Sequence, residues 1–323
     1  SILGAFYTPY PLARSLIQQM LDLENISFSS IIQRSFLEPA AGIGVFAIAY
    51  IDEVLDRARQ EDLLCEDNVR QLIENVHCTE IDSFTFNVMC RTIASHLIDN
   101  YSQYLGARPV TVHAICADAL VNISEQKPTL RGPVDFCGSC DVSRGFDYVV
   151  TNPPYNLLKP NSKRGIVGEE QKSLDAVRQA VDSNRGLIGV LGVKNLYRIF
   201  MGRIMQAWMV EGGSMALVVP ATLMGDATAA DLRRELLDSY KVSEMVVLGE
   251  NDPHFPLVSQ SIVAFAAKQV KCEGQTSAIR VRSGGAVVEH SRTLIESAGG
   301  VIPLAQISPF ASQLLNRKIP TLG

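Results

Sequence analysis

Short apolar runs and longer amphipathic stretches alternate along the chain. The apolar runs are rich in β-branched and aromatic residues and predict buried strands; they lie at 35–41, 76–82, 110–115, 146–150, 214–219, 242–248, 260–268 and 278–284. Helical spacing of apolar residues recurs at 11–22, 45–59, 83–97, 168–182, 195–210 and 231–240. Strands that alternate with helices predict an α/β protein with a mostly parallel sheet.

The run Phe146–Val150 stops at Asn152-Pro153-Pro154-Tyr155. The two prolines fix their own φ and lack an N–H, so they predict a stiff turn at the carboxyl end of a strand. Open α/β sheets bind their ligands at this edge. The turn offers two acceptors, the Asn152 side-chain oxygen and the Pro153 carbonyl, and one aromatic face, Tyr155. Two acceptors outside the ring plane of an aromatic amine stabilise the positive charge that develops on its nitrogen during attack.

A second pattern, Glu38-Pro39-Ala40-Ala41-Gly42-Ile43-Gly44, lies between a predicted strand and a predicted helix. Glycines allow close approach of a ligand to the backbone, and the helix N-terminus offers free N–H groups. The glycine spacing alone also fits nicotinamide dehydrogenases. Glu38 favours a ligand that carries an ammonium group, because a carboxylate at this position repels a pyrophosphate. A dehydrogenase would also leave Asn152–Tyr155 without a purpose.

Asn-Pro-Pro-Tyr after an apolar strand resembles the catalytic motif of S-adenosylmethionine-dependent N6-adenine DNA methyltransferases of the γ arrangement, found in restriction–modification systems. Two more stretches resemble that family: Phe6–Pro9 before the first helix, and Asn195–Tyr197 followed by a helix, Gly212-Gly213, an apolar strand and Pro220–Thr222. The resemblance covers about residues 4–270. It implies a doubly wound, mostly parallel, seven-stranded sheet of the class I methyltransferase (Rossmann-like) type with a C-terminal antiparallel strand.

The resemblance also implies roles for single residues. The implied catalytic residues are Asn152, Pro153, Pro154 and Tyr155. The implied contacts to the cofactor S-adenosyl-L-methionine are Tyr7, Thr8, Pro9, Glu38, Ala40, Gly42, Gly44, Glu80, Ile81, Asp118, Ala119 and Asn152. Glu38 would bind the amino group of the methionine moiety, Glu80 the ribose hydroxyls and Asp118 the adenine amine. The implied substrate contacts are Tyr155, Phe255, Asn195 and Tyr197, with the target ring between Tyr155 and Phe255. From the residues alone, Asp82 is the better cap for the helix at 83–97.

The composition indicates the class of protein and the cellular compartment. Its 323 residues are 47% hydrophobic, enough for a sizeable core. The seven cysteines are odd in number and dispersed, which predicts reduced thiols and a cytosolic setting. The resemblance implies the cytoplasm of a bacterial or archaeal cell. We favour two loop cysteines over a zinc site at Cys137 and Cys140, and expect no metal. No apolar run is long enough to span a membrane. The net charge of −5 argues against a broad nucleic-acid-binding surface on this chain alone.

We expect residues 1–290 to form the catalytic domain, with a substrate-side insertion at 157–192, and 291–323 to be a linker toward a C-terminal DNA-recognition domain. The expected partner is double-stranded DNA with a flipped adenine, and the recognition and nuclease modules are fused or separate. Two alternatives stay open. The same chemistry serves enzymes that methylate a protein glutamine or an RNA guanine, and the chain could be a non-catalytic cofactor- or DNA-binding module. The intact motif at 152–155 argues against the second.

Overall fold

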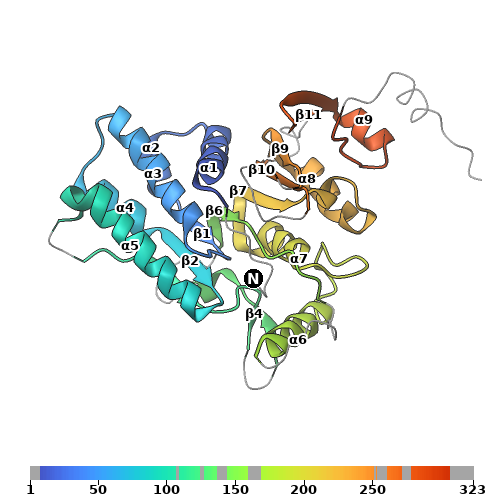
Figure 1. The fold of residues 1–323 in the computed structure, drawn as a ribbon, viewed down its shortest axis with the longest axis horizontal. Coiled ribbons are helices and arrows are strands. Elements are labelled where there is room, and N and C mark those ends of the chain that lie inside the picture. Colours follow the sequence, from blue (N-terminus) through green and yellow to red (C-terminus); the bar gives the residue numbers. More distant parts are fainter. Residues whose placement is uncertain are drawn as a thin grey trace, which may run out of the picture.

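The structure is a computed structural model of the 323-residue chain (Figure 1). It describes residues 8–106, 109–123, 127–136, 144–158, 169–250, 252, 260–270 and 278–305. Several residues that the sequence singles out therefore lie outside the described residues: Tyr7, Cys137, Cys140, Phe255 and residues 159–168 of the insertion.

A ten-stranded sheet forms the centre of the part that the structure describes, in the order β12-β11-β9-β10-β7-β6-β1-β2-β3, with β8 also paired to β10. Its strands are β1 (Phe36–Glu38), β2 (Val76–Glu80), β3 (His113–Cys116), β6 (Phe146–Thr151), β7 (Met209–Pro220), β8 (Tyr240–Val242), β9 (Met245–Leu248), β10 (Ile262–Gln269), β11 (Ala278–Ser283) and β12 (Ala286–Ser291). Strands β3, β2, β1, β6 and β7 pair in parallel. Strand β10 runs antiparallel to both β7 and β9.

This arrangement confirms the predicted α/β class, with a parallel half and a C-terminal antiparallel strand. The predicted count of seven strands is too low, because β8, β11 and β12 also join the sheet. Strand β11 pairs in parallel with β9, and the β11–β12 hairpin turns at Gly284 and Gly285, which both have positive φ. Such a hairpin covers the open edge of β9, which would otherwise expose unpaired backbone groups.

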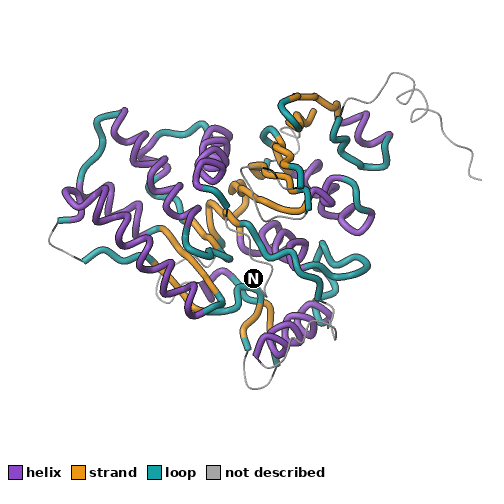
Figure 2. The backbone as a smooth tube through the Cα atoms, in the orientation of Figure 1, coloured by secondary structure: helices purple, strands orange, loops and turns teal. Residues whose placement is uncertain are grey.

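Helices pack around this sheet (Figure 2). They are α1 (Tyr10–Glu24), α2 (Phe28–Ile31), α3 (Val45–Gln60), α4 (Glu66–Glu74), α5 (Ser83–Leu105), α6 (Glu169–Asp182), α7 (Leu196–Arg203), α8 (Ala230–Ser239) and α9 (Arg292–Ser297). Helix α1 contacts α3, β7 and β10, whereas α5 contacts β2 and β3. Asp82 caps α5 as predicted, because its side chain accepts the Thr85 N–H at 2.7 Å.

The helix after Asn195 ends earlier than the sequence predicts. Helix α7 gives way to one π-helical turn, Ile204–Trp208, and β7 begins at Met209. Gly212 and Gly213 therefore lie inside a strand and do not end the helix. Met209 pairs with Phe146 of β6, so strand pairing across the sheet overrides the local helical pattern.

The segment after β12 covers the start of the expected linker at 291–323, and the domain boundaries stay a prediction. Over residues 292–305 it forms α9 and a following turn that pack on the domain. Ile295 and Ile302 are buried, and Arg292 donates to the Leu237 carbonyl at 2.7 Å. Arg233 of α8 donates to the Gly300 carbonyl at 2.8 Å, and the Ile302 N–H donates to the Met224 carbonyl at 2.9 Å.

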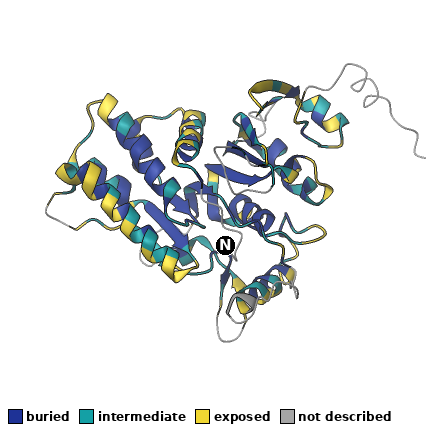
Figure 3. Ribbon diagram, viewed as in Figure 1, coloured by how far each residue is buried: buried dark blue, intermediate teal, exposed yellow. Residues whose placement is uncertain are grey.

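The core follows the sheet (Figure 3). Side chains of β6, β7 and β10 such as Val149, Val218 and Phe265 are 0% exposed, and exposed residues gather on the outer faces of the helices. None of the described helices combines the length and apolar character that a membrane crossing needs.

Candidate functional site

A cavity of about 770 Å³ lies at the carboxyl ends of β1, β2, β3 and β6. This volume falls within the usual range for small-molecule sites. The cavity is lined by the residues that follow each of these strands, together with side chains from α6 and α7. Of the predicted site residues, the cavity wall includes Thr8, Glu38, Ala40, Gly42, Glu80, Ile81, Asp118, Ala119, Asn152 and Pro154. Five separate stretches of the sequence therefore meet at one site.

Glu38 ends β1 and lies at the base of this cavity. Its carboxylate is 1% exposed and accepts the Ala47 N–H at 2.9 Å in the first turn of α3. Burial raises the pKa of the Glu38 carboxyl well above its ordinary value, and the charge of Glu80 raises it further. No Lys or Arg of the described chain forms an ion pair with Glu38. A buried carboxylate without a cation is a suitable partner for a ligand ammonium group.

The two glycines of the turn serve different purposes. Gly42 has a φ of +57° and lines the cavity, and its N–H donates to Glu80 Oε2 at 2.9 Å. Gly44 has a φ of +83° and is not part of the cavity wall. A Cβ at Gly44 would approach Ile93 of α5 to 2.9 Å, so this glycine permits helix packing.

Glu80 ends β2 and is held by the backbone on both sides. Oε2 accepts from Gly42, and Oε1 accepts the Asp82 N–H at 2.9 Å. Burial raises the pKa of Glu80. Each oxygen keeps a second lone pair for a ligand hydroxyl. The adjacent Ile81 is 43% exposed and lines the cavity, where its apolar side chain can pack against a ring.

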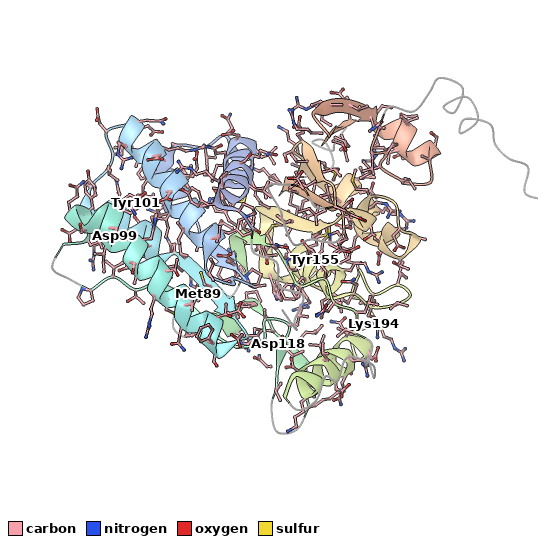
Figure 4. All side chains as sticks on the ribbon, viewed as in Figure 1. Met89, Asp99, Tyr101, Asp118, Tyr155 and Lys194 are labelled. Carbon is pink, nitrogen blue, oxygen red and sulfur yellow. The ribbon has the colours of Figure 1, made fainter. Side chains whose placement is uncertain are left out.

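Asp118 follows β3 and lies beside α6 (Figure 4). Its Oδ1 accepts the Leu120 N–H at 2.8 Å, and its Oδ2 accepts the Ser173 hydroxyl at 2.5 Å. Burial raises the pKa of Asp118, although the Ser173 hydrogen bond acts in the opposite direction. Asp118 is thus oriented by two donors, and with Glu38, Glu80 and Asp82 it is one of four acidic residues in the cavity wall.

The Asn152 amide follows β6 and is oriented from both ends. Its Nδ2 donates to Thr8 Oγ1 at 3.1 Å, and its Oδ1 accepts the Tyr155 hydroxyl at 2.6 Å. The Tyr155 hydroxyl also lies 3.2 Å from the Val218 carbonyl of β7. Tyr155 is 8% exposed and does not line the cavity. The ring must therefore become accessible before it can stack on a substrate, and stacking by Tyr155 stays a prediction.

Asn195 and Tyr197 brace the turn that holds Asn152. The Asn195 Nδ2 donates to the Tyr155 carbonyl at 3.0 Å, and its Oδ1 caps α7 by accepting the Tyr197 N–H at 3.2 Å. The Tyr197 hydroxyl lies 3.3 Å from Thr222 Oγ1. Neither Asn195 nor Tyr197 lines the cavity, and substrate contact by them stays a prediction. Pro9 is the N-cap of α1, also away from the cavity wall.

Sequence reasoning missed several residues of the cavity wall. Among them are Val45, Phe46, Asp82, Ala117, Leu120, Ile123, Lys172, Ser173, Leu174, Val177, Leu196 and Phe200. Two pairs among them, Ser173 with Val177 and Leu196 with Phe200, have the four-residue spacing of one helical face. This spacing was visible in the sequence, but only the packing of α6 and α7 shows that these faces meet the cavity.

Three solved structures are similar to this chain in fold. The ATP-dependent Type ISP restriction-modification enzyme LlaBIII bound to DNA gives a TM-score of 0.60 at 13% identity, over 87% of this chain and 20% of that one. The DrdV–DNA complex gives 0.58 at 17% identity, over 87% and 27%. A modification subunit of a putative type I restriction enzyme from Vibrio vulnificus YJ016 gives 0.53 at 18% identity, over 86% and 46%.

The chain thus spans less than half of the length of each of these three proteins, and at such identities the similarity establishes the fold alone. No curated protein matches the sequence.

The match to a protein-family model shows to which family the chain belongs. The model of the Eco57I restriction-modification methylase matches residues 74–255, more than half of the chain. The matched segment includes Glu80, Asp118 and Asn152, which the cavity brings together. This match confirms the resemblance to restriction–modification methyltransferases. The chain belongs to the Eco57I restriction-modification methylase family.

Proposed function

We propose that this protein transfers a methyl group from S-adenosylmethionine to the N6 amine of adenine in DNA, as the catalytic part of a restriction–modification or phage-defence protein. The observation that carries the proposal is the shared cavity. Three carboxylates, Glu38, Glu80 and Asp118, and the Asn152 amide line one space at the carboxyl edge of the sheet.

The three carboxylates suit the three polar parts of the cofactor. Glu38, which is buried and without a cation among the described residues, matches the ammonium of the methionine moiety. Glu80, held by Gly42 and Asp82, matches the two ribose hydroxyls. Asp118, held by Leu120 and Ser173, matches the adenine amine. When bound, the cofactor supplies an electrophilic methyl group on a sulfonium.

Asn152 would act on the acceptor amine. An aromatic amine is a poor nucleophile, because its lone pair is delocalised into the ring. The Asn152 Oδ1 and the Pro153 carbonyl accept its two N–H groups and stabilise the charge that develops on nitrogen. The hydrogen bonds to Thr8 and Tyr155 orient the amide, so little reorganisation is needed. Oδ1 keeps one lone pair beyond the bond to Tyr155. The proton of the methylated amine then leaves to water, so no strong general base is needed.

DNA is the proposed acceptor because of the family and because two of the solved structures with a similar fold are bound to DNA. Asn152 is set into a cavity, and a base inside a duplex cannot reach it. The target adenine would therefore be flipped out of the helix. We further propose that residues up to about 290 form one catalytic unit, and that recognition and nuclease modules are fused or separate.

The direct test is transfer of tritium from labelled S-adenosylmethionine to duplex DNA by the full-length protein, followed by chromatography of the nucleosides. Label in N6-methyladenine supports the proposal. Label in another base, or transfer to protein or RNA in place of DNA, contradicts it.

Thr8→Val should lower turnover by about fivefold and leave the KM for the cofactor nearly unchanged. Valine keeps the shape of threonine but removes the acceptor of the Asn152 Nδ2 bond, and one such bond contributes about 1 kcal/mol. Thr8→Ser, which keeps the hydroxyl, should restore turnover. A raised KM for the cofactor with normal turnover would show that Thr8 binds the cofactor and does not orient Asn152.

Affinity for S-adenosylhomocysteine should fall as the pH is lowered. The pKa values of Glu38, Glu80 and Asp118 are all raised by burial, so these carboxyls take up protons at a higher pH than exposed ones. The ligand donors need ionised acceptors, so Kd rises by about tenfold per pH unit for each proton that binding must release. Titration calorimetry between pH 7.5 and 5.5 measures the slope, with circular dichroism to monitor folding. A flat profile in folded protein would contradict ionised acceptors.

A further inference from the structure

Helix α6 closes the cavity beside Asp118, although its sequence lies in the insertion that follows the catalytic turn. Ser173, Leu174 and Val177 of this helix line the cavity. The apolar face of α6, which includes the buried Val177 and Val181, packs on the β-hairpin of β4 (Val121–Asn122) and β5 (Thr129–Leu130). Figure 1 shows α6 next to β4, below the main sheet.

One hydrogen bond joins α6 to the acidic side chains of the cavity. Ser173 Oγ donates to Asp118 Oδ2 at 2.5 Å, between residues that are 55 positions apart. A second bond anchors the helix near the catalytic turn, because Arg178 Nη2 donates to the Leu158 carbonyl at 2.7 Å. Leu158 lies shortly after Tyr155 in the chain. Helix α6 is thus held at both sides of the site.

The geometry at Asp118 leaves room for a ligand donor. Oδ1 accepts from the Leu120 N–H and Oδ2 from Ser173, and each carboxylate oxygen has two lone pairs. The two bonds fix the rotation of the carboxylate. Both also favour its charged form, against the effect of burial. Without the Ser173 hydroxyl, Asp118 can rotate and take up a proton more easily.

We propose that Ser173 is a positioning residue that holds Asp118 as a charged acceptor for the 6-amino group of the cofactor, and thereby selects adenine over a 6-oxo purine. A 6-oxo purine presents a carbonyl oxygen where adenine presents N–H groups, and a charged carboxylate repels that oxygen. The inference rests on the cofactor of the proposed function. It adds a specificity residue that comes from the substrate-side insertion.

Binding of two ligands by the full-length protein tests this inference: S-adenosylhomocysteine and its deaminated analogue S-inosylhomocysteine, both measured by titration calorimetry. Ser173→Ala should weaken binding of S-adenosylhomocysteine by about tenfold, as for one hydrogen bond to a charged group. The analogue should lose little, so the preference for the adenine ligand falls by a similar factor. Ser173→Thr, which keeps the hydroxyl, should restore the preference.

Two controls isolate the contact. Ser183→Ala removes a hydroxyl just beyond the same helix, where it donates to the Gln179 carbonyl at 2.8 Å, and should leave both affinities unchanged. In an Asp118→Asn background, Ser173→Ala should have no further effect on the preference, because the two residues act as one unit.

Three results would overturn the inference. Wild-type affinities in Ser173→Ala, or equal losses for both ligands, would show that the hydroxyl does not select the purine. An undiminished effect in the Asp118→Asn background would show that Ser173 acts by another route. If the wild-type protein binds neither ligand, the proposed cofactor fails and the inference with it, which is distinct from a change seen only in the variants.

Discussion

Asn152→Ala should lower the rate of methyl transfer by roughly 100- to 1000-fold, while S-adenosylhomocysteine binds within about twofold of its wild-type affinity. The side chain would supply an acceptor for the charge that develops on the amine, and loss of one such preorganised group has effects of this size. The cavity acids Glu38, Glu80 and Asp118 do not depend on Asn152 for their hydrogen bonds. Tyr155 keeps the Val218 carbonyl as a partner, so the turn should persist.

Single-turnover transfer from tritiated cofactor to duplex DNA measures the chemical step, and calorimetry measures the binding. Asn100→Ala is the matched control, because Asn100 is exposed on α5 and its amide bonds only within that helix, to His96. This variant should keep wild-type rates. A rate for Asn152→Ala within tenfold of wild type would contradict the catalytic role of the amide, whatever the cofactor affinity.

Trp208→Ala should lower the free energy of unfolding by about 4 kcal/mol, the usual cost of emptying a large aromatic site in a core. Trp208 is 0% exposed and lies in the π-helical turn between α7 and β7. Its ring packs edge to face on Phe136 and Phe200, with centroids 5.2 and 5.7 Å apart. Its Nε1 donates to the Arg131 carbonyl at 2.9 Å. The indole therefore joins α7, β7 and the segment after β5.

Urea unfolding followed by circular dichroism measures this loss, with thermal unfolding as a second readout. Trp208→Phe keeps an aromatic ring but removes the Nε1 donor, and should lose about 1–2 kcal/mol. Phe84→Ala is the control for an aromatic deletion, because Phe84 is 77% exposed; its stability should change by less than about 0.5 kcal/mol. A loss below 1 kcal/mol in Trp208→Ala would show that the ring contributes little to the core.

The positions of the polar side chains of the site can be predicted from local sequence for a simple physical reason. Glu38, Glu80 and Asn152 each stand at or directly after the end of an apolar strand, and parallel strands bring their carboxyl ends to one edge. Asp118 follows β3 in the same way. Once the strands pair, these side chains have to lie at the same edge of the sheet. The cap of α5 by Asp82 is equally local, because it depends only on the next three residues.

The boundaries that were wrong depend on contacts between distant segments. The start of β7 at Met209 is set by pairing with β6, some sixty residues earlier in the chain, and the strand count by a hairpin that adds to β9. Local propensity around Met209 favours a helix, and its contribution is smaller than that of sheet pairing. The strand at 278–283 is visible as an apolar run, but its place beside β9 follows from pairing alone.

Sequence alone therefore determined the fold class, the family resemblance and the polar side chains at the strand ends. Tertiary structure alone decided that α6 closes the cavity through the Ser173–Asp118 bond and that α9 packs on α8. It also decided that the Tyr155 hydroxyl bonds to Asn152 and that the Tyr155 ring does not line the cavity. The reason is the range of the interactions. Strand ends and helix caps are specified by neighbouring residues. The direction of a side chain and the position at which a helix packs depend on residues that lie far away along the chain.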